Sequence, residues 1–235
     1  HNCDVDCGGG DYYYPMAMIV PLFSQSNVVL FPKTPVPLYI FEERYRTMVE
    51  DAIAGNREIV IALLRDESEA GYTGVESVYA IGCLGRIESL DEQEDGKYNI
   101  VVGGLSRVRI VRETQRFPYP AVEVEAIDDL PRDEFSDELI ARHNRMSGLF
   151  ARFVELATGE SKGASELMPQ MDFDSLVNTV AMTLNTTMEQ KQDLLEMDDP
   201  FQRCDILTAI LAQQIEMLEI IRRFEHLKPE RLHFN

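Results

Sequence analysis

Residues 29–32 read Val-Leu-Phe-Pro, and residues 37–49 read Pro-Leu-Tyr-Ile-Phe-Glu-Glu-Arg-Tyr-Arg-Thr-Met-Val. The hydrophobic period changes within this stretch. Residues 36–40 form a short β-branched and aromatic run, which predicts a strand. From Phe41 the apolar residues recur every three or four positions, which predicts a helix as far as Ala52. Five apolar side chains of the stretch are expected in the core: Phe31, Leu38, Ile40, Phe41 and Tyr45.

Short runs of the strand type continue on both sides of this stretch, to about Asp128, and Gly, Pro, Asp or Asn bounds each of them. Asp95-Gly96 between two runs is a hairpin signal. Because only one helix interrupts the strands, the pattern predicts a closed or partly closed barrel. The predicted strands are residues 19–23, 36–40, 59–64, 78–87, 98–105, 108–111 and 121–127.

The period becomes helical after residues 129–133. Ser136 has the character of a helix N-cap, and Pro200 suits the first position of a later, long helix. That long helix carries apolar residues on more than one face, which predicts burial on several sides. The sequence therefore predicts an α+β protein in three parts. They are a tail at residues 1–16, a β-barrel with one inserted helix at 17–130, and an α-helical bundle at 131–235.

Acidic residues outnumber basic residues by 41 to 22, which gives a formal net charge of −19. A nucleic-acid partner requires a basic stripe to neutralise phosphates, and both halves of the chain are acidic instead. No apolar run approaches the roughly 18 residues that a membrane helix needs. We therefore expect neither a nucleic-acid nor a membrane partner, and we interpret the negative charge as a contribution to solubility.

The motifs of common catalytic and metal sites are missing from the sequence. It contains no G-x-x-x-x-G-K-[ST], G-x-G-x-x-G, G-x-S-x-G or H-E-x-x-H. Residues 91–102 begin like a calcium loop, but Val102 stands where a bidentate Glu is required. His143 lies on an apolar helical stripe, where packing is favoured over catalysis. Arg107 and Arg109 share a strand face and are expected to offset nearby acids rather than to bind an acidic ligand. We expect no catalytic residue, no cofactor and no metal site.

The four cysteines are too few and too scattered for a disulfide scaffold. Cys83 and Cys204 lie in apolar runs, where a free thiol usually behaves as a small core residue, so we expect a reducing compartment and a cytoplasmic location. His1, Cys3 and Cys7 belong to an aperiodic tail. A zinc site there is disfavoured, because zinc sites space paired cysteines by two to four residues and need a second pair of ligands.

The stretch at residues 29–49 resembles the amino-terminal, substrate-binding domain of Lon-type ATP-dependent proteases, because several fixed residue types recur in it at fixed spacing. A second block, within residues 81–110, is similar to the hairpin region of that family. A weaker match covers residues 191–207. The resemblance extends over roughly residues 18–225, which is almost the whole chain.

This resemblance implies a PUA-like barrel followed by a helical bundle, and a role in recognising protein substrates rather than cutting them. The chain ends at Asn235 without an ATPase or a Ser-Lys peptidase module, so we expect a stand-alone bacterial protein. Its partners would be unfolded or exposed apolar protein segments, with a protease or chaperone as a further partner of this adaptor. The binding groove is expected between barrel and bundle, from loops at 24–33 and 158–171. The candidate peptide-binding residues are Phe31, Pro32, Leu167, Met168 and Met171.

Two other functions remain open from the sequence. Barrels of the PUA type often bind RNA, although the net charge opposes RNA binding here. A hydrolase would need a nucleophile and a base, and the sequence suggests no such pair.

Overall fold

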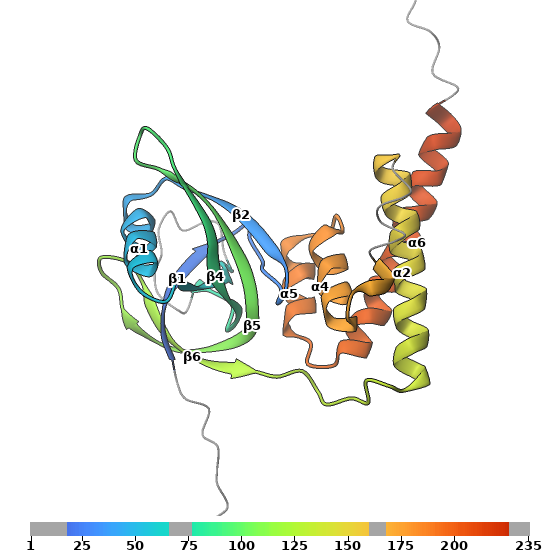
Figure 1. The fold of residues 1–235 in the computed structure, drawn as a ribbon, viewed down its shortest axis with the longest axis horizontal. Coiled ribbons are helices and arrows are strands. Elements are labelled where there is room, and N and C mark those ends of the chain that lie inside the picture. The colour runs from blue at the N-terminus through green and yellow to red at the C-terminus, as the bar shows by residue number, and fades with distance from the viewer. Residues whose placement is uncertain (1–17, 66–76, 160–167, 226–235) are drawn as a thin grey trace, which may run out of the picture.

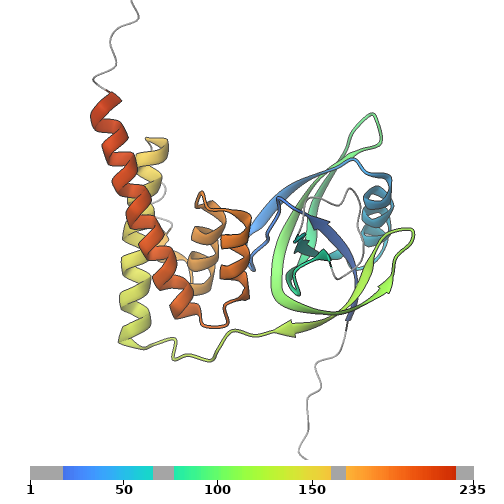
Figure 2. The same ribbon diagram turned by 180° about the vertical axis from the view of Figure 1, so that it is seen from behind.

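The computed structural model describes residues 18–65, 77–159 and 168–225, in which a mixed sheet lies beside a group of helices (Figure 1). Residues 128–136, which contain no helix or strand, join the two along one side (Figure 2). The strands are β1 (Met18–Gln25), β2 (Pro35–Ile40), β3 (Glu58–Leu63), β4 (Ile81–Glu92), β5 (Tyr98–Gln115) and β6 (Ala121–Ile127). The helices are α1 (Glu43–Ala54), α2 (Asp137–Thr158), η2 (Met168–Gln170), α4 (Phe173–Thr183), α5 (Met188–Glu196) and α6 (Pro200–Glu225).

The six strands follow the order β2-β5-β4-β3-β1-β6, and β6 pairs with β5 as well as with β1. Only β1 and β3 are parallel; the other pairs are antiparallel. With its 18 residues β5 is long enough to pair with β2 and β4 near its start and with β6 near its end. The predicted strands at 98–105 and 108–111 are therefore one strand, because the pairing continues through irregularities that bend it.

β2 pairs only with β5 among the described strands, so it has a free edge. Pro35 and Pro37 are two of its six residues, and proline has no backbone N–H. A proline fits an edge strand when its nitrogen faces away from the neighbouring strand, and residues two apart face the same edge. The free edge of β2 is therefore poor in hydrogen-bond donors.

α1 packs against the sheet on the side far from the other helices (Figures 1 and 2). Its buried residues Tyr45, Met48, Val49 and Ala52 have the predicted helical spacing. The prediction that Phe41 is a core residue was wrong, because its side chain is 56% exposed. The helix begins only at Glu43, so Phe41 lies before the stripe that faces the sheet.

α2 and α6 lie side by side, with α4 and α5 between them and the sheet (Figures 1 and 2). Ser136 caps α2 as predicted, since its hydroxyl accepts a hydrogen bond from the Leu139 amide at 3.2 Å. The expectation that α6 is buried on several sides was wrong for its last turns, which extend beyond α4 and α5. The exposed apolar residues there are Met217, Ile220, Ile221 and Phe224.

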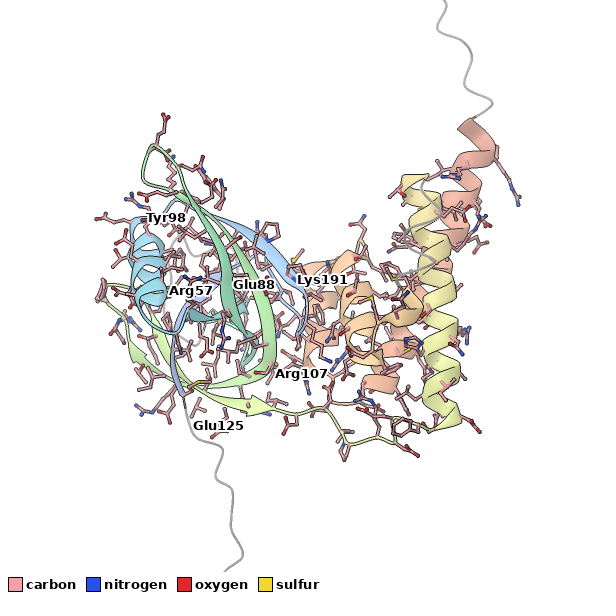
Figure 3. The ribbon with its side chains drawn as sticks, in the orientation of Figure 1. Arg57, Glu88, Tyr98, Arg107, Glu125 and Lys191 are labelled. Carbon is pink, nitrogen blue, oxygen red and sulfur yellow. The ribbon has the colours of Figure 1, made fainter. Side chains whose placement is uncertain are left out.

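A buried charge network joins the sheet to the helices. The side chains of Arg107 on β5 and Arg203 on α6 are 3% and 1% exposed, and each forms an ion pair with Asp129, at 2.9 and 3.0 Å. Arg107 also pairs with Asp198 at 2.9 Å, and Figure 3 shows Arg107 on the side of the sheet that faces the helices. The prediction that Arg107 offsets nearby acids is confirmed, whereas Arg109 on the same strand face is exposed.

Candidate functional site

One hollow lies where the sheet meets the helices. It encloses about 550 Å³. The loop before β2 contributes to it, as do the start of α2 and the segment that leads into α4. We call it the junction pocket and define it by Lys33, Arg132, His143, Met171, Asp172 and Phe173.

Two ion pairs lie at the junction pocket. Lys33 Nζ donates to Asp172 Oδ1 at 2.9 Å, and Arg132 donates to Asp174 at 2.6 Å. Burial alone would raise the pKa of Asp172, but hydrogen bonds from Lys33 and Ser175 lower it to about 2. The pocket therefore presents these two ion pairs and the carboxylate of Glu134 beside a few apolar side chains, rather than a continuous apolar surface.

His143 lies 2.8 Å from the main-chain oxygen of Met171 through its Nε2 atom. This contact fixes the ring against the segment before α4, which agrees with the packing role predicted for His143. No general-base role is needed to account for its position.

Of the predicted peptide-binding residues that the structure describes, only Met171 lines this pocket, and none is fully exposed. Phe31 is 0% exposed in the core that the helices form with the sheet, so it contributes packing rather than contact area. Met168 and Met171 are partly buried against the same core, and Met171 also lines the junction pocket. The half-buried Pro32 accepts a hydrogen bond from Asn178 at 3.1 Å through its carbonyl oxygen. The remaining candidate, Leu167, lies outside the described residues.

A second hollow lies beside two exposed aromatic rings. Tyr39 and Phe41 are 52% and 56% exposed, and their ring centroids are 6.1 Å apart. The hollow encloses about 280 Å³, and Val28 and Pro37 border it with the two rings. We call it the aromatic hollow and define it by Val28, Pro37, Tyr39 and Phe41. Sequence reasoning missed it because it assigned Phe41 to the core.

The sequence does contain a signal for the outward direction of Tyr39. Its neighbours Leu38 and Ile40 are both buried, and side chains alternate along a strand. A core position for Leu38 and Ile40, which the sequence predicted, therefore requires Tyr39 to point away from the core.

A third hollow, of about 400 Å³, lies on the other side of Tyr39 and reaches across β2, β5 and β4. We call it the cross-strand hollow and define it by Pro37, Tyr39, Asp91, Asn99 and Val101. Pro37 and Tyr39 border both hollows, so the two adjoin at these residues.

Lys97 lies close to the Tyr39 ring, with its ammonium 5.9 Å from the ring centroid. It also pairs with Asp95 at 2.6 Å, and this hydrogen bond raises the pKa of Lys97. The charge beside the aromatic ring is therefore already compensated by a carboxylate of the same hairpin.

Within the described ranges, no three His, Cys, Asp or Glu side chains come together as metal ligands. None of the helices in this part of the chain is long and apolar enough to cross a membrane. Cys83 and Cys204 are buried free thiols, and burial raises the pKa of both. The tail with His1, Cys3 and Cys7 lies outside the described residues.

Curated relatives of the chain are Lon proteases. Lon protease 2 of Syntrophobacter fumaroxidans is 30% identical over 207 residues, which are 88% of this chain and 25% of the relative. The Lon protease of Trichlorobacter lovleyi is 26% identical over 216 residues, which are 91% of this chain and 26% of the relative. The chain thus spans about a quarter of the length of these relatives.

Two solved structures share the fold. The N-terminal domain of Mycobacterium avium complex Lon protease gives a TM-score of 0.64 at 21% identity, over 83% of this chain and 98% of that chain. A Lon N-terminal domain protein from Xanthomonas campestris gives a TM-score of 0.61 at 24% identity, over 82% and 98%.

A family model also matches this chain. The model of the ATP-dependent protease La (LON) substrate-binding domain matches residues 19–213, which is most of the chain. This range includes residues 29–49, which carry the resemblance to the family. The chain therefore belongs to the family of Lon substrate-binding domains.

Proposed function

We propose that this protein is a non-catalytic module that binds exposed apolar segments of other polypeptides at the aromatic hollow. Membership of a substrate-binding family supports a role in binding proteins. The observation that carries the choice of surface is the pair of adjacent aromatic side chains, Tyr39 and Phe41, each more than half exposed beside a hollow. Exposed aromatic rings bring a large apolar area to an interface and lose little side-chain entropy.

The size of this surface favours weak, reversible binding. An aromatic side chain buries roughly 150–250 Å² when it is fully covered, and about half of each ring is still exposed here. Two half-exposed rings therefore supply much less area than the roughly 800 Å² per partner of a stable protein complex. Weak binding allows such a module to release a bound polypeptide to a further partner.

The occupant is held by its side chains rather than by strand addition to β2. Strand addition needs alternating donors and acceptors along a free edge. Pro35 and Pro37 remove two N–H donors from the edge of β2. Aromatic and apolar contacts at Tyr39 and Phe41 remain the main source of affinity.

The junction pocket is the second proposed contact, as the sequence suggested. Pro32, Leu167, Met168 and Met171 belong to this proposal, and Phe31 supports the loop from beneath. The paired charges of the pocket make it less suited to an apolar segment than the aromatic hollow.

The proposal extends to architecture and setting. The double pairing of β6, with β1 and β5, supports a PUA-like barrel over residues 17–130, and the packing of α2, α4 and α6 supports a helical bundle over 131–235. Two buried free thiols support a reducing, cytoplasmic setting. A protease or chaperone that receives the bound polypeptide is the proposed further partner.

The test is a binding titration of the full chain with a permanently unfolded probe, reduced and alkylated α-lactalbumin carrying a fluorophore. We expect Tyr39→Ser combined with Phe41→Ser to weaken binding about tenfold while the melting temperature stays within about 2 °C, because both rings are exposed. Phe224→Ser is the matched control, since Phe224 is 62% exposed near the end of α6, far from β2 in Figure 1.

The same titration compares the two proposed contacts. If Met168→Ser with Met171→Ser weakens binding and the aromatic variant does not, the junction pocket is the site and the aromatic assignment is wrong. If the native chain binds the unfolded probe no better than it binds folded α-lactalbumin, the proposed function itself is refuted.

A further inference from the structure

The cross-strand hollow places an acidic side chain in line with Tyr39. Tyr39 on β2 is the register partner of Asn99 on β5, and Asn99 is the partner of Asp91 on β4. All three side chains are exposed and border the same hollow. Neighbouring strands are about 4.8 Å apart, so the Cα atoms of Tyr39 and Asp91 are separated by roughly 10 Å.

The charge of Asp91 is uncompensated within the part of the chain that the structure describes. Its Oδ2 atom accepts a hydrogen bond at 2.7 Å from the neutral amide of Gln93. Lys97, which lies in the turn of this hairpin, is paired with Asp95 instead. On the opposite side of the Tyr39 ring, Glu42 is neutralised by Arg44 at 2.8 Å. The cross-strand hollow therefore has an apolar end at Tyr39 and an anionic end at Asp91.

We propose that the polypeptide segment bound here carries a Lys or Arg about four residues away from its apolar or aromatic anchor. This inference rests on the proposed function. The anchor occupies the aromatic hollow against Tyr39 and Phe41, and the extended chain crosses β2 and β5 so that the basic side chain meets Asp91. An extended chain advances about 3.3 Å per residue, so four residues cover about 13 Å, which spans the roughly 10 Å from Tyr39 to Asp91 and reaches into the aromatic hollow; side chains four residues apart also point to the same face.

The opposite charge is disfavoured at the same place. A segment with Glu or Asp at this spacing brings a carboxylate to the carboxylate of Asp91, at a hairpin that also carries Glu92 and Glu94. Exposed ion pairs are individually weak, so the preference for Lys over an uncharged residue amounts to about fivefold. The site then selects apolar segments with basic flanks from among apolar segments in general.

The experiment measures fluorescence anisotropy of labelled fourteen-residue peptides with the full chain at low salt. All peptides share one central Phe-Leu anchor and carry Lys, Ser or Glu four residues before and after it, so either chain direction presents the residue to Asp91. We expect affinity in the order Lys, Ser, Glu. A fourth peptide, with Lys moved to three residues from the anchor, should bind like the Ser peptide, because the Lys side chain then points away from the sheet.

Asp91→Asn should abolish the preference for Lys over Ser and leave the affinity of the Ser peptide unchanged. Glu94→Gln is the matched control, because it removes the same charge from the same hairpin at a position that does not line the hollow. It should retain the preference. High salt should reduce the preference in the native chain, since exposed charges are screened.

The outcomes separate the two proposals. Equal affinity for the Lys, Ser and Glu peptides overturns the inference and leaves the proposed function standing. A preference for Lys that survives Asp91→Asn also overturns it, because another group then carries the selection. Failure of every peptide to bind, together with failure of the unfolded probe, refutes the proposed function and the inference with it.

Discussion

Replacing Asp129 with asparagine removes the negative charge that Arg107 and Arg203 share while preserving the size of the side chain. The two guanidinium groups stay buried after the change. Arg107 retains its ion pair with Asp198. Arg203 keeps only neutral acceptors among its described contacts, the carbonyl oxygen of Met197 and the side-chain oxygen of Asn178.

The expected loss follows from the burial of these groups. Removing one partner of a buried ion pair typically costs about 3–5 kcal/mol, because it leaves an uncompensated charge away from water. The side chain of Asp129 is 22% exposed and one arginine keeps a second carboxylate, so we expect the lower end, about 3 kcal/mol. In a chain of this size that loss lowers the melting temperature by roughly 6–12 °C.

Urea unfolding followed by circular dichroism at 222 nm measures this loss, with tyrosine fluorescence as a second probe because the sequence contains no tryptophan. Asp198→Asn is the matched control. Asp198 lies at the same distance from Arg107, 2.9 Å, but its side chain is 59% exposed. Its replacement should cost less than about 1 kcal/mol.

Similar losses for the two variants would refute the reasoning, because burial would then not distinguish the two carboxylates. A loss below about 1 kcal/mol for Asp129→Asn would refute it as well, since the shared carboxylate would then not stabilise the junction.

Two further changes test the sheet and the junction pocket. Gly104→Ala should lower the free energy of unfolding by about 2 kcal/mol, because the new methyl group overlaps the main-chain oxygen of Phe31. Gly103→Ala should lower it little, because its methyl group meets the movable side chain of Glu88, labelled in Figure 3. Equal losses in urea unfolding would contradict this. The pKa of Asp172 is about 2, below its ordinary 3.8, so its ion pair stabilises the fold fully above about pH 4 and the contribution disappears as the pH falls toward 2. The melting temperature of the native chain should therefore fall more over this window than that of Asp172→Asn, and parallel curves would show that the pair contributes nothing.

The helices were predictable because their boundaries depend on local signals. Ser136 caps α2, Gly159 ends it in a left-handed conformation, and Pro200 begins α6. Each signal acts within one helical turn, so it can be read from neighbouring residues.

The departures from prediction concern the environment of a residue rather than its local conformation. Phe41 stands at the change from strand to helix, where neither period decides which way its side chain points. Arg107 and Arg109 lie on the same face of β5. Arg107 is buried because α5 and the 128–136 connection cover it, whereas Arg109 stays exposed. Such cover depends on residues far away in the sequence.

The candidate site was predictable in part. Lys33 and Met171 come from the two loops that were expected to face each other, and both line the junction pocket. The charges that fill this pocket were not expected, because the pairing partners lie in separate segments. The aromatic hollow was missed although the alternation of Leu38, Tyr39 and Ile40 contained its signal.

The proline-bearing edge of β2 also affects how the molecule behaves in a concentrated solution of unfolded chains. Such chains form cross-β aggregates by extending any sheet edge that offers a regular ladder of donors. Pro35 and Pro37 interrupt that ladder next to the rings of Tyr39 and Phe41, the proposed binding surface for apolar segments of unfolded chains. The proposed binding surface therefore lies beside a sheet edge that is a poor template for fibril growth.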